Sequence, residues 1–332
     1  MNRLPRAVAS FCPAVFNMNR LSPLTKGGLV GVLLAFLFNG TSTPQNHSNT
    51  TYRLEKNRVV PCDFRAAFPS VKALGTDEVE FRVSRSGDFY FIFYEKAKLC
   101  RLDSTGKLIR SVSTVNPLNR RSSGLALSPE GDVFILDGRG KHLYRYDASL
   151  DLIGNYLLGS KDELEPLFGL AATSWGDLFV SGGLKSTIWK LEPEGQGFSA
   201  KPLYLQESYR YFHPAEEEGG RLMATDPLGA LLVLDRYGNL LRSFNFRKGL
   251  RAYPTDGNYL VTFWPYTELM VLDTVGVVLA NWKTAELDSV FKQVHDFQVL
   301  KDKAYFFLPA FEKIFVFRIE SFDPSAIRQG RH

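Results

Sequence analysis

The chain has 332 residues, of which 45% are hydrophobic and 13% aromatic, so it can bury a substantial core. Its formal net charge of +5 is concentrated at the N-terminus, because the first 42 residues hold four basic residues and no acidic one. Without those four, the 40 basic residues become 36 against 35 acidic ones, and residues 43–332 are nearly neutral. A nucleic-acid-binding protein needs a sustained basic face, so we expect no nucleic acid as a partner.

Residues 1–42 have the composition of an export signal. Basic residues precede an apolar stretch of about a dozen residues, Gly27 to Phe38, which matches the core of a signal peptide and is too short for a membrane span of ~20 residues. Met18 is an alternative start, and Gly40 and Ser42 are small residues that suit cleavage. The sequence therefore predicts a secreted or extracytoplasmic protein, with an uncleaved membrane anchor as the alternative.

The segment after this leader holds a tether, a strand and a cysteine. Residues 43–51 are polar and predict a tether, and residues 52–60 form a strand-like run that belongs to no repeat. Cys62 and Cys100 are the two cysteines outside the leader. In an exported domain they either form a disulfide or remain two buried thiols, which is the more ordinary outcome. Neither has a Cys or His two to four residues away, so their spacing indicates no metal site.

Six repeat units fill most of the chain. Each unit begins with a turn-like residue, and a strand-like run ends sixteen residues after it. The six turn-like residues are at positions 87, 131, 176, 219, 257 and 302. This spacing of 38 to 45 residues is the length of one four-stranded propeller blade. Within each unit, apolar runs rich in branched and aromatic residues alternate with turn residues. The sequence predicts an all-β fold, a six-bladed β-propeller over residues 52–322, with a polar tail over 323–332.

Two details of the repeat carry structural expectations. The acid that closes a unit is followed by Gly at the third place, as in Asp103 and Gly106, which a tight hairpin requires. The second unit has Leu150 at that place, and we expect it to turn in another way. The sixth unit lacks a fourth apolar run, so we expect the strand at 52–60 to close the last blade and cover its edge.

The segments Gly124 to Asp137 and Gly169 to Val180 resemble the repeats of NHL-type six-bladed β-propellers, and the resemblance covers roughly residues 74–320. It implies the architecture and says little of activity, since propellers of this shape include protein-binding domains, lactonases and lyases. Units four to six depart from the pattern at Asp226 to Gly229 and at Trp264 to Tyr266, which leaves any transfer of ligand-binding residues there open.

The hairpins that join the second and third strands of the blades differ in chemistry around the ring. Those of blades 1 to 3, with the loop that enters blade 2, are basic, and those of blades 5 and 6 are aromatic. The basic residues, which we call the basic crescent, are Lys96, Lys98, Arg120, Arg121, Arg139, Lys141 and Lys185; the aromatic ones are Trp264, Tyr266 and Phe311. Such a face suits a partner that is partly anionic and partly apolar, such as an acidic peptide or glycan, or another protein. Ordinary solvated hairpins are the alternative.

The sequence offers two weaker hints of catalysis. His142 falls in the hairpin of blade 2, where a lyase could use a base, although a solvated hairpin residue explains it as well. Lactonases of this shape hold calcium on the axis, and the acids at loosely equivalent places here are Glu95, Asp137, Asp226, Glu268 and Glu312. Structural hydrogen bonds at strand ends account for such acids equally well, so we expect no metal and no cofactor.

These observations favour an exported, non-catalytic binding module at the cell surface that recognises a protein, peptide or glycan. We group His142 with the ligand-binding residues of the hairpins and assign no catalytic residue. The alternative is a lactonase-like or lyase-like enzyme with its site at the axial mouth of the propeller.

Overall fold

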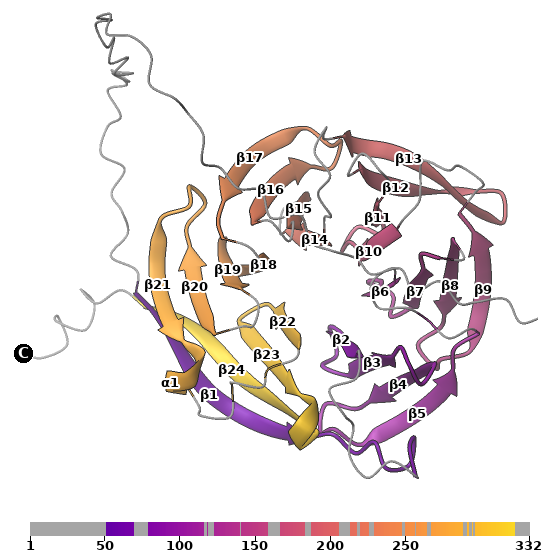
Figure 1. Cartoon of the computed structure of the whole chain (residues 1–332), viewed down its shortest axis with the longest axis horizontal. Coiled ribbons are helices and arrows are strands. Elements are labelled where there is room, and N and C mark those ends of the chain that lie inside the picture. Colours follow the sequence, from indigo (N-terminus) through magenta and orange to yellow (C-terminus); the bar gives the residue numbers. More distant parts are fainter. Residues whose placement is uncertain are drawn as a thin grey trace, which may run out of the picture. The chain divides into compact units, whose positions relative to one another are not determined.

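The computed structural model describes residues 51–69, 79–115, 118, 123–139, 141–158, 167–182, 187–205, 213–217, 220–225, 229–247, 250–255, 257–263, 267–287, 291, 294 and 296–322. The described residues form six four-stranded antiparallel sheets arranged as a ring, a six-bladed β-propeller (Figure 1). The predicted fold class is therefore confirmed. The predicted leader, nearly all of the tether and the polar tail lie outside the described residues and stay predictions.

The blades follow one another in chain order, and in each the first strand lies nearest the axis and the last at the perimeter (Figure 1). Blade 1 holds β2 (Val79–Val83), β3 (Phe89–Phe93), β4 (Lys98–Leu102) and β5 (Leu108–Ser113). Blade 2 holds β6 (Ser123–Leu127), β7 (Val133–Asp137), β8 (His142–Tyr146) and β9 (Leu152–Leu157). Blade 3 holds β10 (Leu167–Ala172), β11 (Leu178–Gly182), β12 (Thr187–Glu194) and β13 (Gly197–Leu205).

The second half of the ring repeats this order. Blade 4 holds β14 (His213–Glu217), β15 (Arg221–Thr225), β16 (Ala230–Asp235) and β17 (Leu240–Asn245). Blade 5 holds β18 (Leu250–Thr255), β19 (Asn258–Phe263), β20 (Glu268–Leu272) and β21 (Val278–Lys283), followed by the short helix α1 (Thr284–Leu287). Blade 6 holds β22 (Asp296–Leu300), β23 (Lys303–Leu308) and β24 (Lys313–Phe322), with the turn η4 (Pro309–Phe311) before β24 and β1 (Thr51–Pro61) as its outer strand.

The recurring acid and glycine build the turn between the third and fourth strands. Asp103 accepts hydrogen bonds through Oδ1 from the backbone N–H groups of Thr105 and Lys107, at 2.8 and 3.1 Å. Gly106 takes φ = 89° in this turn, a conformation that glycine adopts without steric cost. The expectation for Leu150 was wrong: it adopts φ = 65° in a turn with the same backbone hydrogen bonds, because its side chain is buried in the core between blades 1 and 2.

The N-terminal strand lies where the sequence predicted a missing strand. β1 pairs antiparallel with β24 from Thr51 opposite Phe322 to Pro61 opposite Lys313. Phe64, which follows β1, packs edge-on against Phe91 of blade 1 at 4.9 Å between ring centres, and Phe307 of blade 6 lies 6.4 Å away. The segment after β1 thus contacts both the last and the first blade. That the ring depends on β1 for its stability stays a prediction.

Cys62 and Cys100 are buried in this same aromatic core and are free thiols. Burial raises the pKa of Cys62 well above its ordinary value, and the nearby Glu312 carboxylate raises it further. Burial likewise raises the pKa of Cys100, to about 12. A thiol that stays protonated and out of solvent is unreactive in the folded state, so both cysteines serve as small core residues.

Deleting residues 51–61 should destabilise the protein by several kcal/mol, because blade 6 loses a whole strand and its hydrogen bonds and β24 becomes a bare edge. Chemical denaturation of the full chain and of the deletion variant measures the difference. Deleting residues 43–50 alone is the control and should leave stability unchanged. Equal stability of the two deletion variants would contradict a closing role for β1.

Candidate functional site

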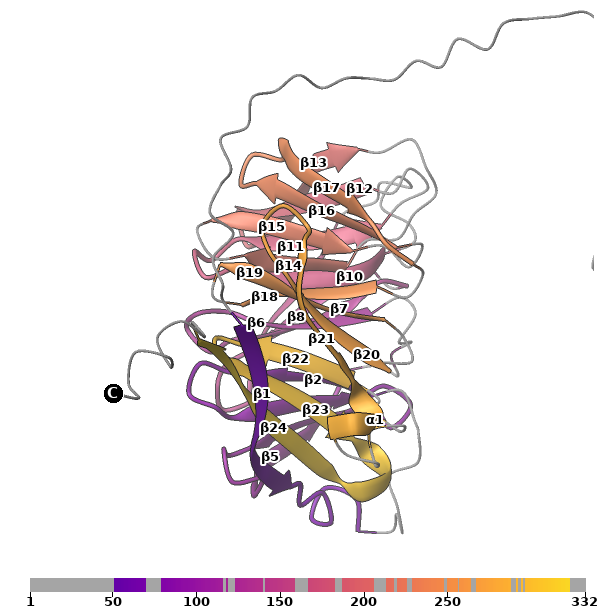
Figure 2. The same cartoon turned by 90° about the vertical axis from the view of Figure 1, so that its left-hand side faces the viewer.

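One face of the ring carries the predicted site. Because every blade runs from its inner strand to its outer strand in the same topology, the connections between second and third strands all emerge on one face, together with the connections from one blade to the next. We call this the hairpin face. In Figure 2, which views the ring from the side, α1 marks this face on the right, since it begins the connection from blade 5 to blade 6.

The lysines of blade 1 gather around the segment that follows β1. The Nζ atoms of Lys96 and Lys98 each lie 5.7 Å from the centre of the Phe68 ring. Lys98 also donates a hydrogen bond to the backbone oxygen of Ala67, at 3.1 Å. Phe68 itself is buried, with 8% of its surface exposed. The two ammonium groups are therefore held near the same aromatic side chain. Since each lies 5.7 Å from the ring centre, the distance between the two nitrogen atoms is at most twice that value.

The basic residues of blade 2 lie in the next hairpin. Arg139 is exposed, and its backbone N–H donates to Oδ1 of Asp137 at 3.2 Å. Within the described part of the chain, no side chain pairs with the Arg139 guanidinium. Lys141 is half-buried and has φ = 55°, and its backbone oxygen accepts a hydrogen bond from Leu158 at 2.8 Å. This hairpin presents its cations from a backbone that hydrogen bonds fix in place.

His142 occupies the first position of β8, beside the hairpin. Its Nδ1 lies 2.8 Å from Oδ1 of Asn155 on the outer strand β9, and its ring stacks on Tyr144 with 5.8 Å between centres. These contacts attach the imidazole to the outer half of blade 2, whereas the wall of the axial mouth is built from inner strands. Phe311, in the hairpin of blade 6, is 41% exposed. Arg120, Arg121, Lys185, Trp264 and Tyr266 lie outside the described residues.

The described acids among those that could have held calcium form no metal-binding group. Glu268 binds Arg247 and accepts a hydrogen bond from Asn281 Nδ2 at 2.8 Å, and Glu312 takes a left-handed conformation at the end of η4. Asp226 is outside the described residues. In the part of the chain that the structure describes, no three His, Cys, Asp or Glu side chains are grouped closely enough to hold a metal ion.

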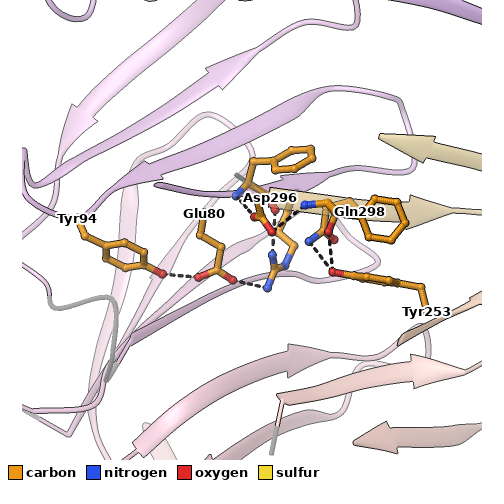
Figure 3. Close-up of polar contacts among 8 residues, drawn as sticks. Glu80, Tyr94, Tyr253, Asp296 and Gln298 are labelled. Atoms are coloured by element: carbon orange, nitrogen blue, oxygen red, sulfur yellow. Dashed lines mark hydrogen bonds and ion pairs between the residues drawn. The ribbon is translucent and has the colours of Figure 1, made fainter. Parts of the chain in front are cut away.

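A polar network near the axis was not expected from the sequence (Figure 3). We call it the seam network, and its side chains are Glu80, Arg82, Tyr94, Tyr253, Asp296 and Gln298. On blade 1, the Arg82 guanidinium donates to one oxygen of the Glu80 carboxylate and to the backbone oxygen of Phe81, the latter at 2.9 Å. The Tyr94 hydroxyl donates to the other Glu80 oxygen. Both oxygens of Glu80 are therefore occupied.

The network continues into blades 6 and 5. Asp296 on β22 accepts a hydrogen bond from the backbone N–H of Phe81 at 3.1 Å and from that of Phe297 at 2.9 Å. The hydroxyl of Tyr253, on β18, donates to the backbone oxygen of Phe297 at 2.6 Å, and Gln298 donates to this hydroxyl at 3.4 Å. The inner strands of three successive blades are thus linked by side chains.

The seam network holds two carboxylates, of Glu80 and Asp296, and one guanidinium, of Arg82. Burial alone would lower the pKa of the Arg82 guanidinium, but the carboxylates of Glu80 and Asp296 raise it above its ordinary value. Asp296 lies only 3% exposed and each of its oxygens accepts a backbone N–H. Asp296 thus joins β22 to the backbone of β2, and the network acts as a link between blades. The alternation of charged and apolar residues from Val79 to Val83 was the sequence signal for it.

Comparison with solved structures supports the fold. The chain is similar to a catalytically inactive variant of virginiamycin B lyase from Staphylococcus aureus with quinupristin, at 14% identity and a TM-score of 0.54, over 75% of this chain and 82% of that one. It is similar to a streptogramin B lyase, at 14% identity and a TM-score of 0.52, over 82% of this chain and 98% of that one. It is also similar to Raptor of Chaetomium thermophilum, at 9% identity and a TM-score of 0.56, over 83% of this chain and 27% of that one.

At these identities the likeness shows the six-bladed propeller fold alone. No protein-family model matches the chain, and no curated protein is similar to it in sequence. The resemblance to NHL-type repeats therefore stays a prediction, and the function has to be argued from the site itself.

Asp296→Ala should destabilise the protein by about 2 kcal/mol, because it leaves the buried N–H of Phe81 without its acceptor and removes one of the two carboxylates near Arg82. Denaturant unfolding monitored by Trp fluorescence measures the change. Asp302→Ala is the matched control: its partner Arg318 is half-exposed, so its loss should change stability by less than about 0.5 kcal/mol. Similar losses in the two variants would show that Asp296 is an ordinary surface acid.

Proposed function

We propose that this protein is a non-catalytic binding module whose hairpin face recognises an anionic partner, such as an acidic peptide, an acidic glycan or an anionic protein surface. The observation that supports this most directly is the pair of lysines around Phe68. Two ammonium groups near one aromatic ring place positive charge at this point of the hairpin face. Such a local charge attracts an anion, so the arrangement favours a negatively charged ligand.

Arg139 and Lys141 extend the same surface into the neighbouring blade. Both lie in the hairpin between β7 and β8, next in the ring to the hairpin between β3 and β4. Since exposed charge pairs contribute only about 0.2 to 1 kcal/mol each, recognition must use several of these cations together. Such binding is sensitive to ionic strength, because exposed charges are screened over about 8 Å at 0.15 M. Phe311 offers apolar contact on the hairpin of blade 6.

An enzyme with its site at the axial mouth is the alternative that we favour less. Its candidate base, His142, is held by Asn155 on the outer strand, and the carboxylates of the seam network are each bonded within the protein. Turnover of a lactone or a cyclic peptide ester by the purified chain, lost on treatment with a chelator or on changing His142 to Ala, would favour the enzyme over the binding module.

We also propose that the protein is exported, on the basis of its leader. The leader itself lies outside the described residues. Among the residues that are described, no helix has the length and apolar character needed to cross a membrane. Fusing residues 1–42 to a reporter enzyme that is active only outside the cytoplasm tests export, and a cytoplasmic reporter would contradict it.

Reversing Arg139 and Lys141 to Glu should weaken binding to an acidic polymer by about tenfold at low salt, because two attractive contacts become repulsive. Surface plasmon resonance with immobilised heparin and with polyglutamate, each at two salt concentrations, measures the effect. Unfolding should be unchanged, since hairpin tips contribute little to the core.

The matched control reverses Lys301 and Lys303 to Glu. Lys301 also has φ = 55° and lies in a tight turn, but this turn joins β22 to β23 and is on the face opposite the hairpins. The control changes the net charge by the same amount and should leave binding intact. An equal loss of binding in both variants, or no binding of either polymer at low salt, would show that the basic crescent is only a solvated rim.

A further inference from the structure

Within the described residues, no further strand pairs with the outer strand of any blade, and the six outer edges differ in how they are protected. Unpaired edge strands usually carry charges or prolines that prevent pairing with another chain. Four of the six do so: the charged or proline residues are Arg53, Glu55, Lys56 and Arg58 in β1, Arg110 in β5, Lys201 and Pro202 in β13, and Arg242 in β17. β9 contains neither, and β21 is uncharged up to its last residue, Lys283. These two edges lie on opposite sides of the ring (Figure 1).

β21 is the more suitable of the two for pairing. From Thr274 to Trp282 the chain has no charged residue, and Val275, Val277 and Val278 are 60%, 45% and 52% exposed. The same strand packs Leu279 and Trp282 against the core of blade 6, so it is a fixed strand and keeps its edge in one position. β9 has Gly154 in its middle, which weakens a strand for pairing.

The exposed valines lie at the start of β21 and in the turn before it. This turn lies directly on blade 4, since a Cβ atom at Gly276 would come within 2.8 Å of the Phe244 ring of β17. We call the surface formed by Val275, Val277, Val278 and the outer edge of β21 the blade 5 edge. It combines aliphatic side chains with a strand edge to which no described strand pairs.

We propose that the blade 5 edge is a dimer interface, in which β21 pairs antiparallel with β21 of a second copy of this chain about a two-fold axis. An antiparallel pair of identical strands is self-complementary, so one surface suffices on both subunits. The edge is uncharged from Thr274 to Trp282, so no charge pattern there selects a different sequence. Residues 43–332 hold 36 basic and 35 acidic residues, so two copies repel each other little. Each copy covers the other's valines and pairs its free edge.

This interface leaves the hairpin face of blades 1 and 2 open. β21 lies across the ring from blade 2, so a partner docked on β21 does not reach the hairpin between β7 and β8 (Figure 1). The dimer would present two basic crescents at a fixed separation. The proposal does not depend on the proposed ligand, since the contact is made by a different part of the ring.

Sedimentation velocity of the full-length chain over about a hundredfold range of concentration tests the proposal. We expect a reversible dimer for the natural sequence. Val278→Lys should weaken dimerisation by about tenfold or more, because it places like charges opposite each other in the paired strands. Its side chain is half-exposed, so circular dichroism and thermal unfolding should not change. Amide hydrogen exchange in β21 should be slower in the dimer than in the Val278→Lys variant.

Ile153→Lys in β9 is the matched control, because Ile153 is 50% exposed on the other uncharged edge. It should dimerise as the natural sequence does. A chain that stays monomeric at every concentration would overturn the proposal. So would association that Val278→Lys leaves intact, for instance through the N-terminal segment, or association that only Ile153→Lys abolishes.

Discussion

The contact between blade 6 and blade 1 is the constraint on which the ring depends. It joins residues as far apart as Phe81 and Asp296, which are 215 positions apart in the chain. Two kinds of contact join the blades there: the Asp296 hydrogen bond to Phe81, and the aromatic packing of Phe64 between the two blades. Phe64 follows β1, which pairs with β24 within blade 6. Because β1 belongs to blade 6 and β2 to blade 1, the chain itself also joins these two blades, and the closing role of β1 stays a prediction.

The parts of the fold that rest on local rules could be predicted from the sequence. Asp103 and Gly106 specify a turn by themselves, and the number of blades followed from the six units of similar spacing. The position of β1 followed from counting strands, because the sixth unit lacked one. Leu150 was misjudged since its left-handed conformation is stabilised by burial between blades, which no local pattern shows. The seam network was missed for the same reason: its partners come from blades 5, 6 and 1.

The candidate site was predicted in outline. Aligning the hairpins placed Lys96, Lys98, Arg139 and Lys141 on one face, since that follows from the repeat. The role of Phe68 could not be foreseen, because residues 62–69 have no equivalent in the other units and their path is set by the core around Phe64. The link between His142 and Asn155 depends on the register of β8 and β9, and a hairpin alignment gives only the order of strands.

The arrangement separates the residues that hold the ring from those that are available to a partner. Near the axis, both oxygens of Glu80 and of Asp296 are used within the protein, so these acids stabilise the seam at little cost in unpaired charge. At the hairpins, Lys98 donates to a backbone oxygen, and the ammonium groups of Lys96 and Lys98 lie near the Phe68 ring. Arg139 is exposed in the next hairpin. These cations lie in hairpins and outside the contacts that join the blades, so they can be changed without opening the ring, which is what makes the proposed recognition of an anion testable.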